Sequence, residues 1–457
     1  MSIFEPVNLR ADFPDNFVWG VATSSFQIEG AAHADGKGRS IWDSFCEVPG
    51  AVADASNGLI ACDHYHRWEA DLDLIASLGV DAYRFSVSWP RVRPSGSGAW
   101  NQKGIDFYEQ LVDGLLERGI KPYLTLNHWD LPDALQAYGG WTHRDTAHRF
   151  VEYANGMNKR LGDRIACITT HNEPWVMAVL GHETGIFAPG LKDRKLAAQA
   201  AHHLLLSHGM AVQSLRAEGC NAKLGIVLNL SPVQAASKSA ADVAQATLED
   251  GKLVRWYMDP LFKAQYPRDV LDYLGEDAPH VQASDMNTIA TPMDFLGINY
   301  YSRAVVSAAG PWDVTQGGLP ITEMGWEVYP QGLTELLVRL DRDYPVPPIY
   351  VTENGGAFKD TLVAGQVHDA DRTQYIAQHI AAVGEAIRQG VSMEGYMVWS
   401  LLDNFEWASG YAKRFGIVHV DYATQRRTLK DSAHWYRTFL AQMHETADVQ
   451  ETLTQGA

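Results

Sequence analysis

The sequence contains few cysteines, and none of them are paired in a metal-binding or redox spacing. Cys46, Cys62, Cys167 and Cys220 lie far apart along the chain, with no C-x-x-C motif. A zinc site or a disulfide framework would require closer and more regular spacing. We therefore expect free thiols.

Long hydrophobic runs are also missing. No segment approaches the roughly 18 uninterrupted apolar residues that a membrane-spanning helix requires. The first residues, "MSIFEPVNLRADFPDNF", contain acids and prolines where a secretion signal would have an apolar stretch. We therefore expect no membrane association and predict a cytoplasmic location.

The chain has fewer basic than acidic residues. The chain has 37 Lys and Arg against 55 Asp and Glu, which gives a formal net charge of -18 at pH 7. Nucleic-acid binding needs a surface rich in Lys and Arg, so this balance argues against a nucleic-acid partner. Nothing in the sequence indicates an oligomeric state.

A recurring unit organises the 457 residues. Trp68, Leu72, Ile75 and Leu78 are at helical spacing, Gly79 is a stop signal, and the apolar segment "AYRFSVSW" follows as a strand. The same order recurs in "FYEQLVDGLLERGIKPYLTLNHWD" and in "RTQYIAQHIAAVGEAIRQGVSMEGYMVWSLLDN". The pattern predicts helices alternating with strands, which is typical of a parallel sheet.

Eight segments have the composition of buried strands. They are "NFVWGVATS", "AYRFSVSW", "PYLTLNHW", "ACITTHNE", "LGIVLNL", "DFLGINYY", "PIYVTEN" and "GYMVWSLLD". Eight such units close naturally into a (β/α)8 TIM barrel, whose active site lies at the C-terminal strand ends. A doubly wound sheet is the competing fold, but no G-x-G-x-x-G loop follows any strand. We therefore predict an α/β protein in which residues 1–457 form one barrel domain with elaborated loops.

Polar and aromatic residues gather where these strands end. They are Gln27, Glu29, Arg84, His128, Trp129, Asn172, Glu173, Asn229, Asn299, Tyr301, Glu353, Asn354, Trp399, Asp403, Glu406 and Trp407. In a barrel these ends converge on one cavity. Amide, imidazole and carboxylate groups bind hydroxyls, indole rings pack on the C–H face of a sugar, and two carboxylates suit glycosidic hydrolysis.

Four motifs also resemble a known family. "FVWGVATSSFQIEG" near the start, "THNEP", "YVTENGG", and "FEWASGYAKRFGIVHVDY" near the end are similar to segments of glycoside hydrolase family 1 β-glucosidases, in the same order. The resemblance implies a retaining hydrolase of terminal β-D-glucosyl residues, with cellobiose, short cello-oligosaccharides or aryl glucosides as substrates. It implies no metal and no cofactor.

The resemblance also implies residue roles. Glu173 corresponds to the acid/base and Glu353 to the nucleophile, which Arg84, Asn299 and Tyr301 support. The implied substrate-binding set is Gln27, His128, Trp129, Asn172, Asn299, Tyr301, Trp399, Glu406, Trp407 and Phe415. Trp175, Leu180 and Trp326 correspond to the aglycone site, and the first two are spaced as in relatives that tolerate glucose, so weak product inhibition is expected.

Several alternatives remain open. A 6-phospho-β-glucosidase would place a Ser near Glu406 with Lys and Tyr around the phosphate, whereas this chain has Lys413 but Phe415 in place of the Tyr. A thioglucosidase is disfavoured because Glu173 is intact, and a non-catalytic sugar-binding relative because both glutamates are present. His64 and His66 could indicate a metal-dependent hydrolase, but at the start of a helix adjacent ligands would diverge.

Overall fold

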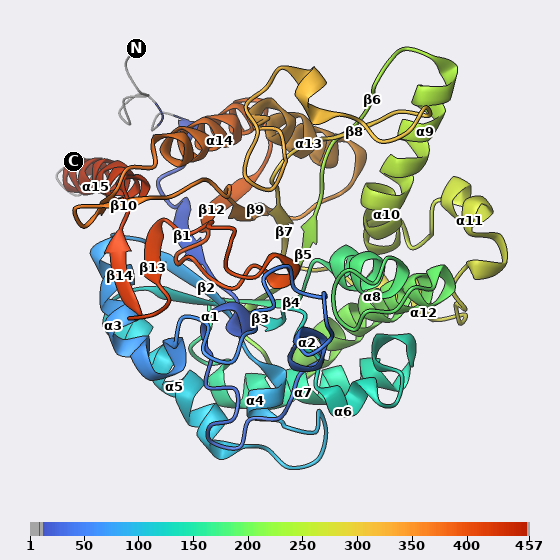
Figure 1. Ribbon diagram of the computed structural model, residues 1–457, viewed down its shortest axis with the longest axis horizontal. Helices are drawn as coiled ribbons and strands as arrows, with labels where there is room; N and C mark the ends of the chain where they lie inside the picture. The colour runs from blue at the N-terminus through green and yellow to red at the C-terminus, as the bar shows by residue number, and fades with distance from the viewer. Residues whose placement is uncertain (1–8, 10–11, 455–457) are drawn as a thin grey trace.

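Eight parallel strands close into a barrel, as the sequence predicts, and all eight predicted strands are confirmed (Figure 1). The computed structural model describes residue 9 and residues 12–454, with residues 444–454 as helical backbone only. Around the barrel each strand pairs with its neighbours in chain order, and the last pairs with the first. The strands are β1 (Val18–Ala22), β2 (Ala82–Ser86), β3 (Lys121–Asn127), β4 (Cys167–Asn172), β5 (Lys223–Asn229), β7 (Phe295–Asn299), β9 (Ile349–Asn354) and β12 (Met393–Trp399).

Helices surround the barrel (Figure 1). The longer ones are α3 (His64–Ser77), α5 (Gln102–Glu117), α7 (Asp145–Leu161), α8 (Arg194–Ala217), α9 (Ala240–Asp250), α10 (Trp256–Lys263), α13 (Pro330–Asp343), α14 (Ala370–Arg388) and α15 (Asp431–Thr454). The shorter ones are α1 (Ser25–Ile28), α2 (Ile41–Cys46), α4 (Trp89–Val92), α6 (Asp133–Gln136), α11 (Arg268–Leu274) and α12 (Asp285–Ile289).

The βα loops carry additional short elements. Two are π-helical, η4 (Val176–Glu183) and η5 (Gly251–Arg255). Four are 3₁₀ turns: η3 (Gly140–Thr142), η6 (Gly275–Asp277), η7 (Val314–Gly317) and η8 (Trp407–Ser409). Three two-stranded sheets pair β6 (Val233–Ala235) with β8 (Ala304–Val306), β10 (Leu362–Val363) with β11 (Gln366–Val367), and β13 (Val418–Asp421) with β14 (Arg426–Leu429).

Glycine ends the helices where the sequence places a stop. Gly79 follows α3 with a φ of 74°, and Gly119 follows α5 with a φ of 71°. Both lie in the left-handed region, which a residue without Cβ enters at little cost. The chain can therefore turn directly from each helix into the next strand.

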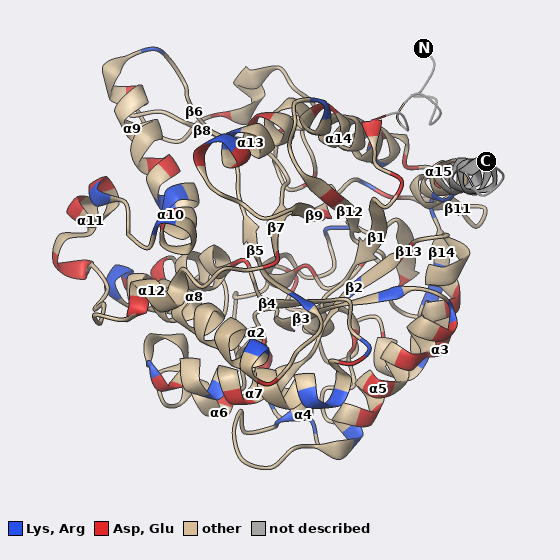
Figure 2. Cartoon of the chain, turned by 180° about the vertical axis from the view of Figure 1, so that it is seen from behind, with Lys and Arg blue, Asp and Glu red and all other residues tan. Residues whose placement is uncertain are grey.

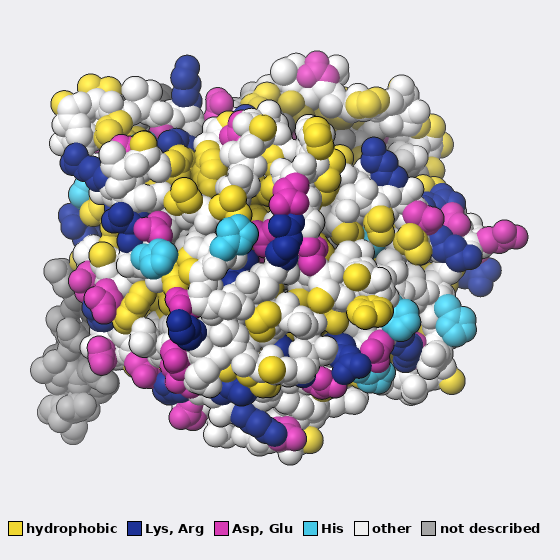
Figure 3. Space-filling model, turned by 60° about the horizontal axis from the view of Figure 1, so that its bottom comes forward, with side chains coloured by type: hydrophobic (Ala, Val, Ile, Leu, Met, Phe, Trp, Pro, Cys, Tyr) yellow, Lys and Arg dark blue, Asp and Glu magenta, His cyan; other side chains and the backbone are white. Residues whose placement is uncertain are grey.

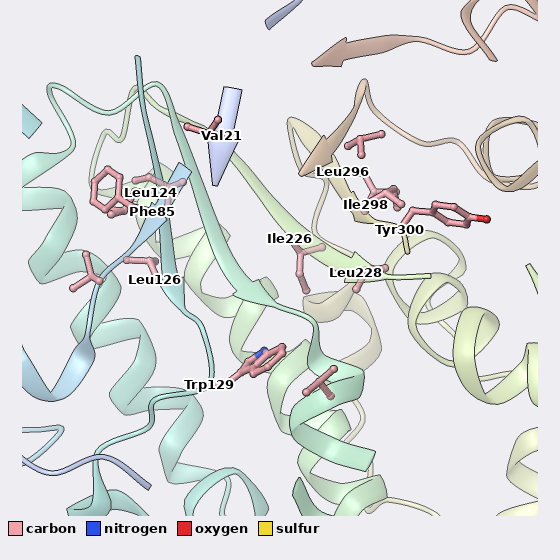
Figure 4. Packing of buried hydrophobic residues seen from close by; sticks show 14 of the residues in the cluster. Val21, Phe85, Leu124, Leu126, Trp129, Ile226, Leu228, Leu296, Ile298 and Tyr300 are labelled. Carbon is pink, nitrogen blue, oxygen red and sulfur yellow. The ribbon is translucent and has the colours of Figure 1, made fainter. Parts of the chain in front are cut away.

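The strands alternate between two apolar layers. Leu124 and Leu126 of β3, like Ile226 and Leu228 of β5, belong to the large core between the barrel and its helices (Figure 4). The residues between them on the strands face the barrel interior, where Tyr123 joins a second cluster. This period of two follows from strand geometry and separates a packing face from an interior face.

Aromatic rings fill the interior of the barrel. The ring of Tyr350 lies edge-on to Tyr123 at 5.8 Å and to Phe295 at 5.6 Å between centroids. All three side chains are buried, with Met397 in the same cluster. Tyr123, Phe295 and Tyr350 lie in the first half of their strands, so they fill the barrel on the N-terminal side of the polar residues at the strand ends.

The surface carries mixed charge. Acidic and basic residues are interspersed on the outer helices, such as α3, α5 and α11, whereas the strands are mostly uncharged (Figure 2). One face of the molecule likewise shows hydrophobic and charged side chains side by side (Figure 3). Within the described part of the chain, no helix combines the length and apolar character needed to cross a bilayer.

Candidate active site

A cavity of about 750 Å³ opens at the C-terminal ends of the strands. Its size is within the usual range for small-molecule sites. The predicted site residues that line it are His128, Trp129, Glu173, Trp175, Leu180, Asn299, Tyr301, Trp326, Glu353, Trp399, Glu406, Trp407 and Phe415. Gln27, Arg84 and Asn172 are buried directly behind this wall, where they hydrogen-bond to lining residues.

Glu353 enters the cavity through an irregularity in its strand. On β9, Tyr350 faces the barrel interior and Val351 the outer core, so regular alternation would direct residue 353 outward. The pairing with β7 shifts between Ile298 and Asn299, where Asn299 lies opposite Glu353. Such bulges re-aim side chains and are frequent beside active sites.

The Glu353 carboxylate has two strong partners. Arg84 donates from Nη1 to Oε1 at 2.7 Å, and the Tyr301 hydroxyl donates to Oε2 at 2.6 Å. Burial raises the pKa of Glu353, but the Arg84 charge and the Tyr301 hydrogen bond act in the opposite direction. Burial also raises the pKa of Tyr301 well above its usual value, so the phenol remains a donor. Glu353 is therefore the carboxyl group of this site best suited to stay ionised.

Glu173 lies just beyond the end of β4, in a strained backbone conformation. The register of β4 against β5 shifts between Thr169 and Asn172, and Glu173 itself has a φ of 51°. Its N–H donates to the carbonyl of Val227 at 2.9 Å, and its own carbonyl accepts from Val176 at the start of η4. Left-handed backbone costs about 1 kcal/mol or more in a residue with a side chain, and such strain concentrates at functional sites.

The environment of Glu173 favours its protonated form. Burial raises the pKa of Glu173 well above its usual value, and the negative charge of Glu353 raises it further. A hydrogen bond from Asn299 and the more distant Arg84 charge oppose these effects without cancelling them. Two carboxyl groups in one buried site cannot both ionise easily, and the proton stays on the one without a direct cation.

Asn299 connects the two glutamates. Its Nδ2 donates to Glu173 Oε1 at 2.6 Å and lies 3.0 Å from Asn172 Oδ1. Its Oδ1 accepts from the hydroxyl of Thr352 at 2.7 Å. Arg84 donates to Asn172 Oδ1 at 2.7 Å, so this oxygen can only accept from Asn299. The Asn299 NH₂ therefore faces Asn172 and Glu173, and its Oδ1 faces the Thr352 hydroxyl.

Glu406 adds a third carboxyl group to the cavity. Burial, followed by the charge of Glu353, raises the pKa of Glu406 to about 8, while Gln27 acts against the shift. Gln27 Nε2 lies 3.4 Å from Glu406 Oε2 and also donates to the Phe405 carbonyl at 2.9 Å. At neutral pH Glu406 can therefore both donate and accept hydrogen bonds toward a bound hydroxyl.

Stacked rings form one wall of the cavity. The imidazole of His128 lies parallel to the indoles of Trp399, at 5.8 Å, and Trp407, at 6.0 Å, with 17° between planes in both cases. Burial lowers the pKa of His128 well below its usual value, so the ring is neutral. Its Nε2 contacts Asn172 at 3.2 Å, while Nδ1 has no hydrogen-bond partner among the described residues. This wall combines flat apolar faces with a buried imidazole nitrogen that lacks a partner in the described part of the chain.

Three strand-end residues from the sequence do not belong to the site. Glu29 receives hydrogen bonds from Arg91 and Tyr108 and lies in the packing between α4 and α5. Asn354 donates to the Tyr300 carbonyl at 2.7 Å, outside the barrel interior. Asp403 forms buried ion pairs instead, described next. Proximity to a strand end in sequence therefore does not by itself place a side chain in the cavity.

A buried ionic network supports the loop that carries Glu406. Asp403 Oδ1 lies 2.7 Å from Lys430 Nζ, and its Oδ2 lies 2.6 Å from Arg414 Nη1. Lys430 also pairs with Asp360, which binds Arg372 at 2.9 Å. These fully or largely buried charges are all matched, as burial requires. The network fixes the position of residues 400–406 without contacting the cavity.

The glycines of "YVTENGG" have a packing role. A Cβ on Gly355 would lie 1.6 Å from the carbonyl oxygen of Trp399. The backbone of β9 thus passes against that of β12 directly after Glu353. Any larger residue at position 355 would clash with the backbone of Trp399.

Asn229, one of the strand-end residues expected to converge on the cavity, lines it at the end of β5. The sequence gives no sign of the role of Thr352, because a threonine inside a strand looks like any other strand residue. In the structure its hydroxyl hydrogen-bonds to Asn299. His64 and His66 diverge as expected, with His64 buried against Asp71 and His66 exposed beside Asp63.

Comparison with known proteins identifies the family. Residues 9–445 match the model for glycosyl hydrolase family 1. Beta-glucosidase A of Acetivibrio thermocellus is 46% identical over 94% of this chain and 98% of its own. A bifunctional beta-D-glucosidase/beta-D-fucosidase of Bifidobacterium breve is 44% identical over 94% of this chain and 98% of its own.

A solved structure agrees with the sequence relatives. The β-glucosidase from Thermotoga maritima in complex with deoxynojirimycin matches with a TM-score of 0.90 at 45% identity, covering 94% of this chain and 98% of that one. The resemblance indicated by the sequence motifs is confirmed across almost the whole chain. This protein belongs to glycosyl hydrolase family 1.

Proposed function

We propose that the protein is a retaining β-glucosidase, with Glu353 as nucleophile and Glu173 as acid/base. The observation that carries the proposal is the unequal environment of the two glutamates in one cavity. Glu353 is held by Arg84 and Tyr301, which favour its ionised form. Glu173 is buried beside that charge and retains its proton. Glycoside hydrolysis with retention needs this pairing of a carboxylate and a carboxylic acid.

The first step forms a glycosyl-enzyme ester. A carboxylate oxygen of Glu353 attacks the anomeric carbon, and the bond from that carbon to the leaving oxygen breaks. The proton of Glu173 passes to the leaving oxygen, which departs as a neutral alcohol. The ester at Glu353 carries no negative charge, so the repulsion that raised the pKa of Glu173 is relieved at this point.

The second step reverses the role of Glu173. As a carboxylate it removes a proton from water, and the water oxygen attacks the anomeric carbon. The ester bond to Glu353 breaks, its carboxylate returns to Arg84, and the sugar leaves with its original β configuration. Apart from the substrate and water, both proposed steps use only side chains of this protein.

The glycone is bound by the remaining polar residues in this proposal. Gln27, His128, Asn172 and Glu406 supply hydrogen-bonding groups for hydroxyls, and Trp399 supplies an apolar floor. The relatives that are named β-glucosidases support glucose as the glycone. The Bifidobacterium breve relative is also named for fucosides, so a panel of substrates should include a β-fucoside. The proposed substrate is a small-molecule glycoside. The cytoplasmic location remains a prediction from the sequence.

A phosphorylated glucoside is a weaker candidate. Lys413 donates to the carbonyl of Glu323 at the protein surface, and Phe415 offers no hydroxyl. A 6-phosphate near Glu406 would adjoin a carboxyl group, whereas phosphate sites use guanidinium or ammonium groups. A non-catalytic relative is disfavoured because both glutamates occupy the cavity with their supporting residues.

Glu353→Ala should abolish turnover of an aryl β-glucoside, because no other group can form the ester. Added azide should occupy the vacated space, attack the anomeric carbon directly and yield the α-glucosyl azide. Product anomer is read by proton NMR. Glu117→Ala, which removes an exposed carboxylate on α5, is the matched control and should keep full activity. Unchanged activity of Glu353→Ala, in a variant that remains folded, contradicts the assignment.

Glu173→Ala should separate substrates by leaving group. A dinitrophenolate departs with little protonation, so formation of the ester should remain fast for dinitrophenyl β-glucoside, whereas cellobiose hydrolysis should fall by several orders of magnitude. Pre-steady-state release of dinitrophenol measures the first step alone. An equal loss for both substrates is the result that speaks against an acid role.

We also propose weak inhibition by glucose. Trp175 and Leu180 line the cavity next to Glu173, and an apolar constriction there disfavours a second, hydrated sugar. The glucose inhibition constant should lie well above the low millimolar range and should decrease in Leu180→Ala, but not in Leu116→Ala, an exposed leucine on α5. Low-millimolar inhibition of the unmodified enzyme contradicts this proposal.

A further inference from the structure

The cavity does not end at the predicted aglycone residues. It continues sideways from the barrel between η4, α8, η5 and α11. Figure 1 shows α8 and α11 on the same side of the molecule. We call this extension the lateral chamber. Its apolar lining includes Val179, Phe187, Ala197, Ala198, Ala201, Leu253, Trp256, Tyr257, Val270 and Leu274, and Glu183 and Thr184 line it at the end of η4.

The lateral chamber exists because one of its walls is built from small residues. Ala197, Ala198 and Ala201 of α8 all face it and are almost fully buried. Opposite them, Val270 and Leu274 of α11 are buried as well. An interior packed at normal density leaves few voids larger than a water molecule. A chamber between helices is therefore unusual.

The backbone on two sides of the lateral chamber departs from α-helical geometry. Val176–Glu183 forms η4 directly after Glu173, and Gly251–Arg255 forms η5. π-Helical segments are rare and occur mostly at functional sites. Both segments contribute lining residues, Val179 from the first and Leu253 from the second. This is an independent indication that the space has a function.

Charged groups gather at the outer end of the lateral chamber. The Tyr273 ring, which is 40% exposed, has Arg194 at 5.1 Å and Lys252 at 5.3 Å from its centroid. Lys252 pairs with Glu249 at 2.9 Å, so its charge is already matched. These side chains mark the outer end, while between them and Glu173 the walls from α8, η5 and α11 are mainly apolar.

The chemistry of the walls indicates the occupant. A sugar needs hydrogen-bonding groups along its length. The lining supplies them near the strand ends, from Asn229 and Ser231, and at the end of η4, from Glu183 and Thr184. At the outer end Arg194 and Lys252 are already paired with Asp277 and Glu249, and the walls from α8 and α11 are mainly apolar. Alanine, valine and leucine side chains favour methylene groups. Building on the proposed function, we propose that the lateral chamber binds the elongated apolar aglycone of the substrate, an alkyl chain in particular, and that alkyl β-glucosides are a preferred substrate class.

Wild-type kinetics on an alkyl series test this proposal first. Each methylene that leaves water is stabilised, so kcat/KM should rise from methyl to butyl to octyl β-D-glucoside, by about tenfold or more between the last two. A flat series overturns the proposal. So does a larger gain from cellobiose to cellotetraose than from butyl to octyl, because the walls would then be binding sugar.

Filling the lateral chamber provides the second test. Ala198→Phe should lower kcat/KM for octyl β-D-glucoside by about tenfold or more and leave methyl β-D-glucoside within about twofold. Ala217→Phe makes the same change at an exposed position of α8 and should affect neither substrate. An equal loss on both substrates in a folded Ala198→Phe variant overturns the proposal.

A second variant guards against misfolding of the first. Leu253→Asp places a carboxylate in the wall from η5, where the side chain is only partly buried, and should reduce selectivity for octyl over methyl in the same direction. Leu116→Asp is its exposed control. The proposed function fails separately, if the wild-type enzyme turns over no β-glucoside at all.

Discussion

Three buried carboxyl groups share one guanidinium group, and the chemistry of the site depends on that imbalance. Glu173, Glu353 and Glu406 line one cavity, and Arg84 binds only Glu353 directly. Ionised carboxylates without partners are costly in a buried site. Protons must therefore remain on the two that lack a cation. In the proposed mechanism, this competition distinguishes the acid from the nucleophile, although both are glutamates at the ends of strands.

The backbone is arranged to produce the imbalance. The register shift in β9 directs Glu353 into the cavity, and the shift in β4 directs Asn172 to the wall directly behind it, where regular alternation would turn both toward the helices. Glu173 takes a left-handed conformation immediately after its strand. Asn299, hydrogen-bonded to Thr352, then bridges from β7 to Glu173. Each departure from regular structure lies within one residue or two of a group that the proposed mechanism uses.

The sequence predicts the barrel well because its signals are local and repeated. Helical spacing, a glycine stop and an apolar strand recur along the chain, and they place all eight strands. It also places both glutamates at strand ends. It could not reveal that Glu29 and Asp403 serve internal ion pairs, since a strand-end carboxylate looks the same in either role. Nor could it reveal the lateral chamber, because Ala198 and Ala201 read as ordinary packing on α8.

The central claim is that the charge of Glu353 holds the proton on Glu173. Its most direct test is the pKa of Glu173, followed by carbon-13 NMR of labelled glutamate carboxyls in the wild-type protein and in Glu353→Gln. Burial is the same in both, so the account predicts that the pKa of Glu173 falls in the variant while remaining above its usual value. An unchanged pKa of Glu173 in Glu353→Gln would contradict the account.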